Sequence, residues 1–393
     1  MEIDVERQRK AREYAKIRRR LSFVDLGIAA VGLLIVFVAG LDKWLRNVVQ
    51  GPAFLRWQPV QGWYPLQILL YFLIVILVYQ LIVAPLSYYS GFVLPHRYEI
   101  STMTFRAWLQ DLIKGLGLGL VLEIAAITLI YGLLASQPLT WWLWVAVIML
   151  FFSVMMANLA PILLYPLFYK FAPLPEGELT QRLLALTQRA NTKVRGIYSM
   201  QMSHKTTAAN AALMGLGNTR RVVVGDTMID RYTLDEIEVV LAHELGHHVH
   251  ADIWKLIISQ SLLMLGGLYI GNLILHAVVD AGFYHALADP ATLPFFFLLA
   301  GVFSLIVMPI GNTYSRLIEY QADEYALQTT YKVEAFKSAM TRLANQNLAE
   351  VEPSPIVEFL FASHPSIGRR LKHADEFATR SGYTFNASAS APS

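Results

Sequence analysis

Six apolar stretches of about 20 residues, each with few charged positions, dominate the pattern of this chain. An α-helix rises about 1.5 Å per residue, so a stretch of this length can cross the hydrocarbon core of a bilayer. The first stretch is too long for a cleaved signal peptide and lacks a convincing cleavage site, so we interpret it as a retained anchor. The pattern predicts six membrane spans, near residues 21–41, 65–86, 115–136, 141–162, 253–277 and 293–311.

Charge sets the orientation of these helices. Hydrophobic residues make up 55% of the chain and charged residues 16%, which is typical of a multi-pass membrane protein. Lys and Arg concentrate before the first span, in 163–252 and near the C-terminus, whereas the 278–292 loop has none. Cytoplasmic segments carry such an excess, so both termini and 163–252 are predicted to be cytoplasmic, at the inner membrane if the source is bacterial. Lys43, Arg46 and Arg56 are a mild exception. The net charge of +3 reflects this topology and gives no reason to expect nucleic acid as a partner.

The chain changes character between the fourth and fifth predicted spans. Residues 177–190 have the periodicity of an amphipathic helix, and 194–201 and 220–225 are typical of short strands, with a loop around Gly215 and Gly217 between them. The predicted fold class is mostly α, a polytopic helical membrane protein with a small α+β domain. Its predicted regions are a four-span membrane region (1–162), a cytoplasmic catalytic part (163–252), two further spans (253–311), a second catalytic part (312–382) and a disordered Ala/Ser-rich tail (383–393).

A His-Glu-Leu-Gly-His motif occupies residues 243–247, on a helix predicted from about 233 to 251. Positions i and i+4 share a helical face, so His243 and His247 can present imidazole nitrogens to one metal ion. Glu244 projects to the side, where its carboxylate can take a proton from water held by the metal. Two nitrogen donors with an open position favour zinc, which lowers the pKa of a bound water from about 15.7 towards about 7.

The third ligand must come from elsewhere in the chain. The position six residues after the motif is Ile253, and the chain has no cysteine. Glu319 and Asp323 are i and i+4 on a helix predicted at 315–326. Glu319 is predicted to bind the zinc ion, and Asp323 to accept a hydrogen bond from the far nitrogen of a ligand histidine. The alternative is an amphipathic helix with a few solvated acids.

With these features the chain resembles the type I CAAX prenyl endopeptidases, which are integral-membrane zinc proteases of the gluzincin group. The likeness spans roughly residues 85–375 and rests on motifs in a fixed order. Each motif alone is only a weak indication of the family, but the ordered set is highly specific for it. The motifs are Tyr165–Leu179, Asn210-Ala211 ahead of Arg220–Thr227, the metal-binding helix, Arg316-x-x-Glu319-x-x-Ala322-Asp323, and His364-Pro365.

The resemblance implies roles for further residues. Asn210 and Ala211 would belong to an edge strand that pairs with the substrate peptide. His364 would stabilise the oxyanion, whereas the sequence alone favours a capping role on the helix predicted from Ser366. The implied set is His243, His247 and Glu319 as zinc ligands, Glu244, His364 and Asp323 as catalytic residues, and Asn210, Ala211 and Arg370 near the substrate.

The resemblance also implies that the spans enclose a water-filled chamber, with a zincin-type catalytic domain at its cytoplasmic end. A chamber would accommodate Glu123, Asn158, Gln260 and Asn272, which are costly in lipid; hydrogen bonds between helices are an equal alternative. Eukaryotic members usually have seven spans, and this chain has one fewer. It also has a compact loop before the metal helix and Gly225 in place of a larger apolar residue, but the metal site is intact.

Three functions are compatible with these features. The leading hypothesis is a membrane-embedded zinc endopeptidase that cleaves CAAX-like or membrane-associated peptides, with or without a prenyl group. A close alternative is a quality-control protease for membrane proteins without prenyl specificity. A transporter or channel with a structural metal site is disfavoured, because structural zinc sites normally have four protein ligands. Only three are found here, beside a correctly placed base.

Overall fold

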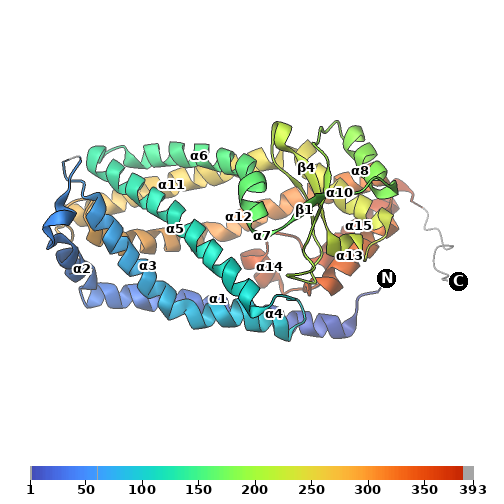
Figure 1. Ribbon diagram of the computed structural model, residues 1–393. Coiled ribbons are helices and arrows are strands. Elements are labelled where there is room, and N and C mark those ends of the chain that lie inside the picture. The colour runs from blue at the N-terminus through green and yellow to red at the C-terminus, as the bar shows by residue number, and fades with distance from the viewer. Residues whose placement is uncertain (1, 60, 384–393) are drawn as a thin grey trace.

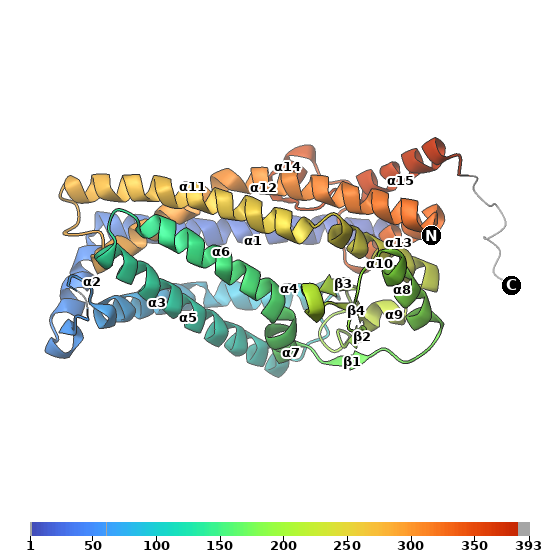
Figure 2. The ribbon, with the colours of Figure 1, turned by 90° about the horizontal axis from the view of Figure 1, so that it is seen from above.

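The computed structural model describes residues 2–59 and 61–383, so the tail predicted at 383–393 lies outside the described residues except for Tyr383. An elongated helical body meets a compact α+β part at one end (Figures 1 and 2). Within the described residues six helices are long and apolar enough to cross a membrane, which confirms the predicted number. They are α1 (Val5–Val38), α3 (Pro65–Tyr88), α5 (Phe105–Ser136), α6 (Trp141–Leu159), α11 (Asp252–Asp280) and α12 (Leu293–Thr330).

Several of these helices extend beyond the predicted spans. The basic N-terminal segment is continuous with the first span in α1, and α5 begins at Phe105, ten residues before the predicted span at 115–136. The boundary predicted between 311 and 312 falls inside α12, so the last span and the helix predicted at 315–326 are one helix. The helix that carries Glu319 is therefore a direct extension of a membrane span, and its position is fixed by the membrane region.

The six spans form a closed ring in which each helix contacts two neighbours. In order around the ring they are α1, α3, α5, α6, α11 and α12, and α12 closes the ring against α1. Only 0% to 28% of the most apolar window of each span is buried within the protein. Glu123 and Gln260 are exposed within their spans, where a polar group is costly unless it faces water or protein. Asn272 instead accepts a hydrogen bond from Trp141 Nε1 at 2.7 Å and links two spans.

The end of the ring away from the α+β part is closed by α2 (Leu41–Gln50) and by the segment around η5 (Pro290–Thr292). Arg46 donates to Asp289 at 3.0 Å, and both side chains are buried. Asp289 also accepts from the backbone N–H of Ala291 at 3.0 Å. Such hydrogen bonds are needed to offset the loss of hydration of a buried ion pair. Arg46 is thus neutralised internally, which explains why it is tolerated in a loop on the side opposite to the basic segments.

A four-stranded sheet forms the base of the α+β part. Its strand order is β1-β2-β4-β3, with β2 and β4 parallel and the two outer pairs antiparallel. The predicted strands at 194–201 and 220–225 correspond to β2 and β4, whereas β1 and β3 have no clear periodicity in the sequence because each is so short. β3 is an edge strand among the described residues. The strands are β1 (Phe171–Pro173), β2 (Ile197–Met200), β3 (Ala211–Met214) and β4 (Arg221–Gly225).

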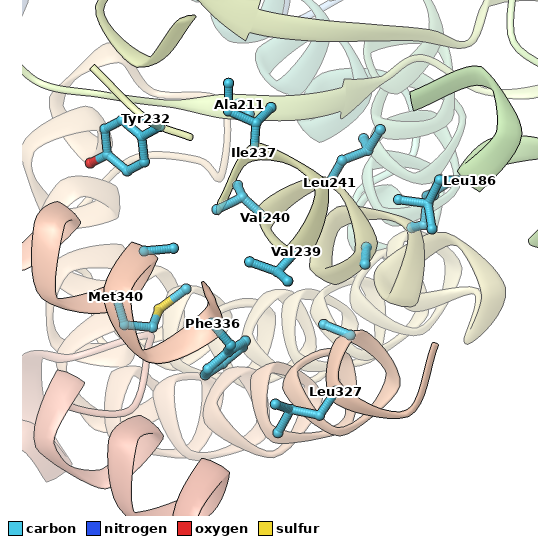
Figure 3. Packing of buried hydrophobic residues seen from close by; sticks show 14 of the residues in the cluster. Leu186, Ala211, Tyr232, Ile237, Val239, Val240, Leu241, Leu327, Phe336 and Met340 are labelled. Carbon is cyan, nitrogen blue, oxygen red and sulfur yellow. The ribbon is translucent and has the colours of Figure 1, made fainter. Parts of the chain in front are cut away.

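The metal-binding helix predicted at 233–251 is α10 (Leu234–Val249), which packs against the sheet. Thr233 and Glu236 form a capping box that satisfies backbone donors at its start. Ile237 and Leu241 lie on its buried face and contact a core that includes Phe336 (Figure 3). Burial of each such side chain contributes roughly 1.5–3 kcal/mol, so the helix is held firmly in place.

The loop after β2 fastens the α+β part to the ring. Ser101, in the turn before α5, forms a β-bridge with Thr206. The Lys205 side chain contacts Asp111 of α5 and lies 4.7 Å from the centre of the Tyr169 ring.

The remaining elements are η1 (Ala53–Arg56), η2 (Tyr89–Val93), α4 (Leu94–Arg97), η3 (Ala160–Leu164), α7 (Tyr165–Phe168), α8 (Glu178–Arg189), η4 (Gly217–Thr219), α9 (Asp226–Ile229), α13 (Val333–Gln346), α14 (Pro355–Phe361) and α15 (Ile367–Ser381).

Single cysteines test the orientation, since the chain has none of its own. Asn218, beside the sheet, and Ala286, at the closed end of the ring, are both exposed. We expect Asn218→Cys to react with a membrane-impermeant maleimide only from the cytoplasmic side, and Ala286→Cys only from the opposite side, because Lys and Arg accumulate in cytoplasmic segments. Labelling of both from the same side would contradict the six-span topology.

Candidate metal centre

The site is created by the close approach of α10 and α12. A Cβ atom on Gly246 would lie 3.0 Å from the Ala322 Cα, so the motif helix can pack this closely only because residue 246 is a glycine. The contact brings Glu319 opposite the two motif histidines. His243 Nε2 and His247 Nε2 lie 3.2 Å apart, and each is 3.4 Å from one carboxylate oxygen of Glu319. The three predicted ligands therefore converge on one point.

Two carboxylates fix the orientation of the imidazole rings. His243 Nδ1 lies 2.8 Å from Asp323, as predicted for a carboxylate one turn after Glu319. His247 Nδ1 lies 3.0 Å from Asp252, which the sequence interpretation missed. When Nδ1 donates to a carboxylate, Nε2 carries the lone pair and is free to bind a metal ion. Asp252 is found only in the structure because Ala251 adopts a left-handed conformation (φ 55°), which turns the chain back towards His247.

Each of these carboxylates is in turn held by a basic side chain. Arg370 Nε donates to Asp323 at 2.8 Å, and both residues are buried. Lys255 donates to Asp252 at 2.9 Å. The prediction placed Arg370 near the substrate; the structure places it behind the ligand histidine, in contact with Asp323 and enclosed by protein. Burial of an unpaired carboxylate is costly, and Arg370 and Lys255 supply the opposite charges that offset this cost.

The electrostatic environment favours a cation. Burial alone lowers the pKa of His243, but the Asp323 and Glu319 carboxylates outweigh it and raise the pKa to about 9. Glu319 Oε2 is buried and has no hydrogen-bond partner. Burial raises the pKa of the Glu244 carboxyl above its usual range, whereas the adjacent histidines and a hydrogen bond from the Leu213 backbone oppose that shift. The His243 imidazole binds a proton strongly, and Glu319 Oε2 lacks a hydrogen-bond partner. Both properties suit a site for a metal ion.

His364 reaches the same centre from the loop before α15. Its Nε2 lies 3.3 Å from Glu319, and its Nδ1 lies 3.0 Å from the Ser363 hydroxyl, while most of the ring is exposed. The residue at the N-cap of α15 is Ser366. The His364 ring thus points at the metal ligands and makes no capping contact with the helix.

Arg316 and Glu358 hold the loop that carries His364. Arg316 Nη1 donates to the carbonyls of Ala362 at 2.6 Å and Glu358 at 2.9 Å, at the end of α14. The Glu358 carboxylate accepts from the Ser366 backbone at 3.1 Å. Neither role was predicted. The signals in the sequence were the position of Arg316 one helical turn before Glu319 and its place at the start of the Arg316-x-x-Glu319 motif.

The free edge of β3 runs past Glu244. The Gly225 N–H donates to the Asn210 carbonyl at 2.8 Å, so the backbone of Asn210 faces β4. Successive residues of a strand direct their backbone groups to opposite sides, so those of Ala211 and Leu213 face the open edge. The side chain of Asn210 is exposed just before this edge. The prediction assigned pairing with the substrate to Asn210 and Ala211. Of these two residues, only Ala211 directs its backbone groups to the open edge.

Comparison with known proteins agrees with this geometry. The model of peptidase family M48 matches residues 173–378, which include all three converging ligands. A second model, described as CAAX prenyl protease N-terminal with five membrane helices, matches residues 1–170. In that region the described structure has four helices of membrane-spanning length, with the shorter α2 between the first two.

Relatives extend the likeness over most of the chain. The metalloprotease YhfN of Bacillus subtilis is 28% identical over 93% of this chain and 85% of its own. CAAX prenyl protease 1 of Saccharomyces cerevisiae is 29% identical over 74% of this chain and 68% of its own. The crystal structure of S. mikatae Ste24p superposes with a TM-score of 0.82 and 25% identity, covering 95% of this chain and 90% of that one. This chain therefore belongs to peptidase family M48, among the CAAX prenyl proteases, and is a metalloendopeptidase embedded in the membrane.

Proposed function

We propose that the metal is zinc, one ion per chain, and that it is held by His243, His247 and Glu319. In a tetrahedral zinc site with bonds of about 2.0–2.1 Å, neighbouring ligand atoms lie roughly 3.3–3.4 Å apart. His243 Nε2 and His247 Nε2 lie 3.2 Å apart, close to that spacing, and each lies 3.4 Å from a Glu319 oxygen, His243 from Oε2 and His247 from Oε1. Three donors from the described residues leave a fourth position for water or substrate, as in catalytic sites. This fit is the observation that supports the proposal most directly.

Each side chain around the ion has a separate role in hydrolysis. Zinc, when bound, acts as a Lewis acid that acidifies water and polarises the scissile carbonyl. Glu244 accepts the proton of the attacking water and returns it to the leaving amine. His364 donates a hydrogen bond to the developing oxyanion. Asp323 and Asp252 hold the ligand histidines in the tautomer with a free Nε2, so they position groups and make no contact with substrate.

The substrate is a peptide in extended conformation, added to the edge of β3. Ala211 and Leu213 offer backbone groups, which pair with a peptide of any sequence. The Ser101–Thr206 bridge and the Lys205–Asp111 contact hold the sheet against the membrane helices, which supports membrane-associated peptides as the substrate class that we propose. The positive segments around the site support a cytoplasmic location.

Recognition through backbone groups favours one rival, a protease without prenyl specificity. Cleavage of matched farnesylated and unmodified CAAX peptides by the purified protein would separate the two. A preference for the farnesylated peptide supports prenyl recognition, and equal rates support the rival.

Removal of the base should separate catalysis from metal binding. We expect Glu244→Gln to keep about one zinc ion per chain but to lose peptide cleavage by several orders of magnitude, since only the proton acceptor is removed. His243→Ala should lose both the metal and the activity. Elemental analysis and a quenched-peptide assay measure these outcomes, and full zinc content in His243→Ala would contradict the ligand assignment.

The two positioning carboxylates should affect metal affinity to similar extents. We expect Asp323→Ala and Asp252→Ala each to weaken zinc affinity by roughly 10–100-fold, the usual effect of losing a partner of a ligand histidine. Competition with a chelator measures this. Glu324→Ala is the matched control, because Glu324 lies on the same helix but pairs with Arg380. Unchanged affinity in Asp252→Ala would show that Asp252 has no part in holding His247.

His364→Ala should act on the transition state. A donor to an oxyanion is typically worth about 2.7–4 kcal/mol, or about 10²–10³ in kcat, so we expect kcat to fall by that factor with zinc content unchanged. The exposed ring makes little packing contact, so Tm should not move. His373→Ala, which removes a histidine of α15 that lies 3.0 Å from Glu324, is the control. A normal kcat with a lower Tm would instead assign His364 a structural role.

A further inference from the structure

The open edge of β3 ends at Ala209, where a side chain takes the place of a neighbouring strand. Asn347 follows α13, and its Oδ1 accepts from the Ala209 N–H at 2.8 Å while its Nδ2 donates to the Ala209 carbonyl at 3.0 Å. One amide side chain thus makes both hydrogen bonds that a residue of an antiparallel strand would make. Gln346 Nε2 donates to the Thr207 carbonyl at 2.7 Å, so the next position is occupied as well.

The hydrogen bonds show that Ala209 lies on the same edge as the site. The carbonyls of Ala208 and Asn210 point the other way, since they accept from Thr227 Oγ1 at 2.7 Å and from the Gly225 N–H at 2.8 Å. Backbone groups of a strand alternate in direction. The outward set is therefore Thr207, Ala209, Ala211 and Leu213. Gln346 and the Ile100 carbonyl bond to Thr207, Asn347 bonds to Ala209, and the Leu213 backbone bonds to Glu244.

We infer that Asn347 determines specificity by limiting how far a peptide can pair with β3 on one side of the cleaved bond. The inference rests on the proposed function, in which the peptide adds to β3 as a strand. Leu213 marks the reacting position because its backbone contacts Glu244. Ala209 lies four residues earlier, or roughly 14 Å at a rise of about 3.4 Å per residue. A substrate strand thus has room for about four residues before it meets Asn347.

The stop is rigid because α13 is anchored in the core. Phe336, Met340 and Ala344 of this helix are buried, and the first two belong to the same hydrophobic cluster as the metal-binding helix. The backbone at Asn347 is therefore held in place, and its side chain can leave the edge only by breaking both hydrogen bonds to Ala209. A peptide longer than the available edge must end at this point or bend away from the strand, which loses backbone hydrogen bonds.

Two series of peptides test this inference with the full-length protein in detergent. Both share one cleavable core, and one is lengthened on the amino side of the cleaved bond, the other on the carboxyl side. We expect kcat/KM of the unmodified protein to fall in one series only, by about tenfold, the scale of one lost contact in a specific site, once the extension passes about four residues. Asn347→Ala should remove most of that fall, and mass spectrometry of the products should show longer fragments from that side.

Asn345→Ala is the matched control, since this neighbouring amide bonds to the Asp4 N–H at 3.1 Å and does not touch the edge. It should leave both series unchanged. Asn347→Asp keeps the acceptor for the Ala209 N–H and replaces Asn347→Ala if that variant does not fold. Cleavage by the unmodified protein that is independent of length, or an equal loss at every length in Asn347→Ala, would overturn the inference and leave Asn347 a structural residue. No cleavage of any peptide would instead overturn the proposed function, and the inference with it.

Discussion

The packing of α10 on α12 is the contact on which the rest of the site depends. Gly246 and Ala322 let the two helix backbones approach closely, and this separation allows Glu319 and Asp323 to reach His243. A larger side chain at either position would push the helices apart and remove both a ligand and its supporting carboxylate. Because α12 is also a membrane span, the metal centre is aligned with the membrane region by the helix itself.

Charge balance explains the groups around the centre. Asp323 and Asp252 are almost fully buried, and each has both a histidine and a basic residue as partners. In Glu319, Oε2 has no hydrogen-bond partner, and the nearest histidine nitrogen, His243 Nε2, lies 3.4 Å away. Since a buried charge without compensation is costly, a cation between the three ligands stabilises this part of the fold. Metal binding and the packing of α10 on α12 are in this sense coupled.

The membrane ring and the sheet have different tasks. The ring holds α12 in position and encloses a space whose far end is closed by the Arg46–Asp289 pair. The sheet offers an edge of backbone groups beside Glu244, and the contact of Lys205 with Asp111 of α5 holds the sheet against the ring. Under the proposed function, selection of a substrate depends on what can enter the space and how far it can extend along β3, more than on contacts to particular side chains.

The sequence by itself determined the features that repeat at short range. Apolar runs of about 20 residues predict the spans, and i, i+4 spacing places His243 with His247 and Glu319 with Asp323. Tertiary structure alone decided which partners meet. Asp252 reaches His247 through a left-handed turn at Ala251, Arg370 is buried behind Asp323, and Asn347 closes the edge at Ala209 from more than a hundred residues away. The first contact is local but depends on a left-handed residue that helical periodicity does not predict, and the other two join segments distant in the chain, whose packing no local periodicity encodes.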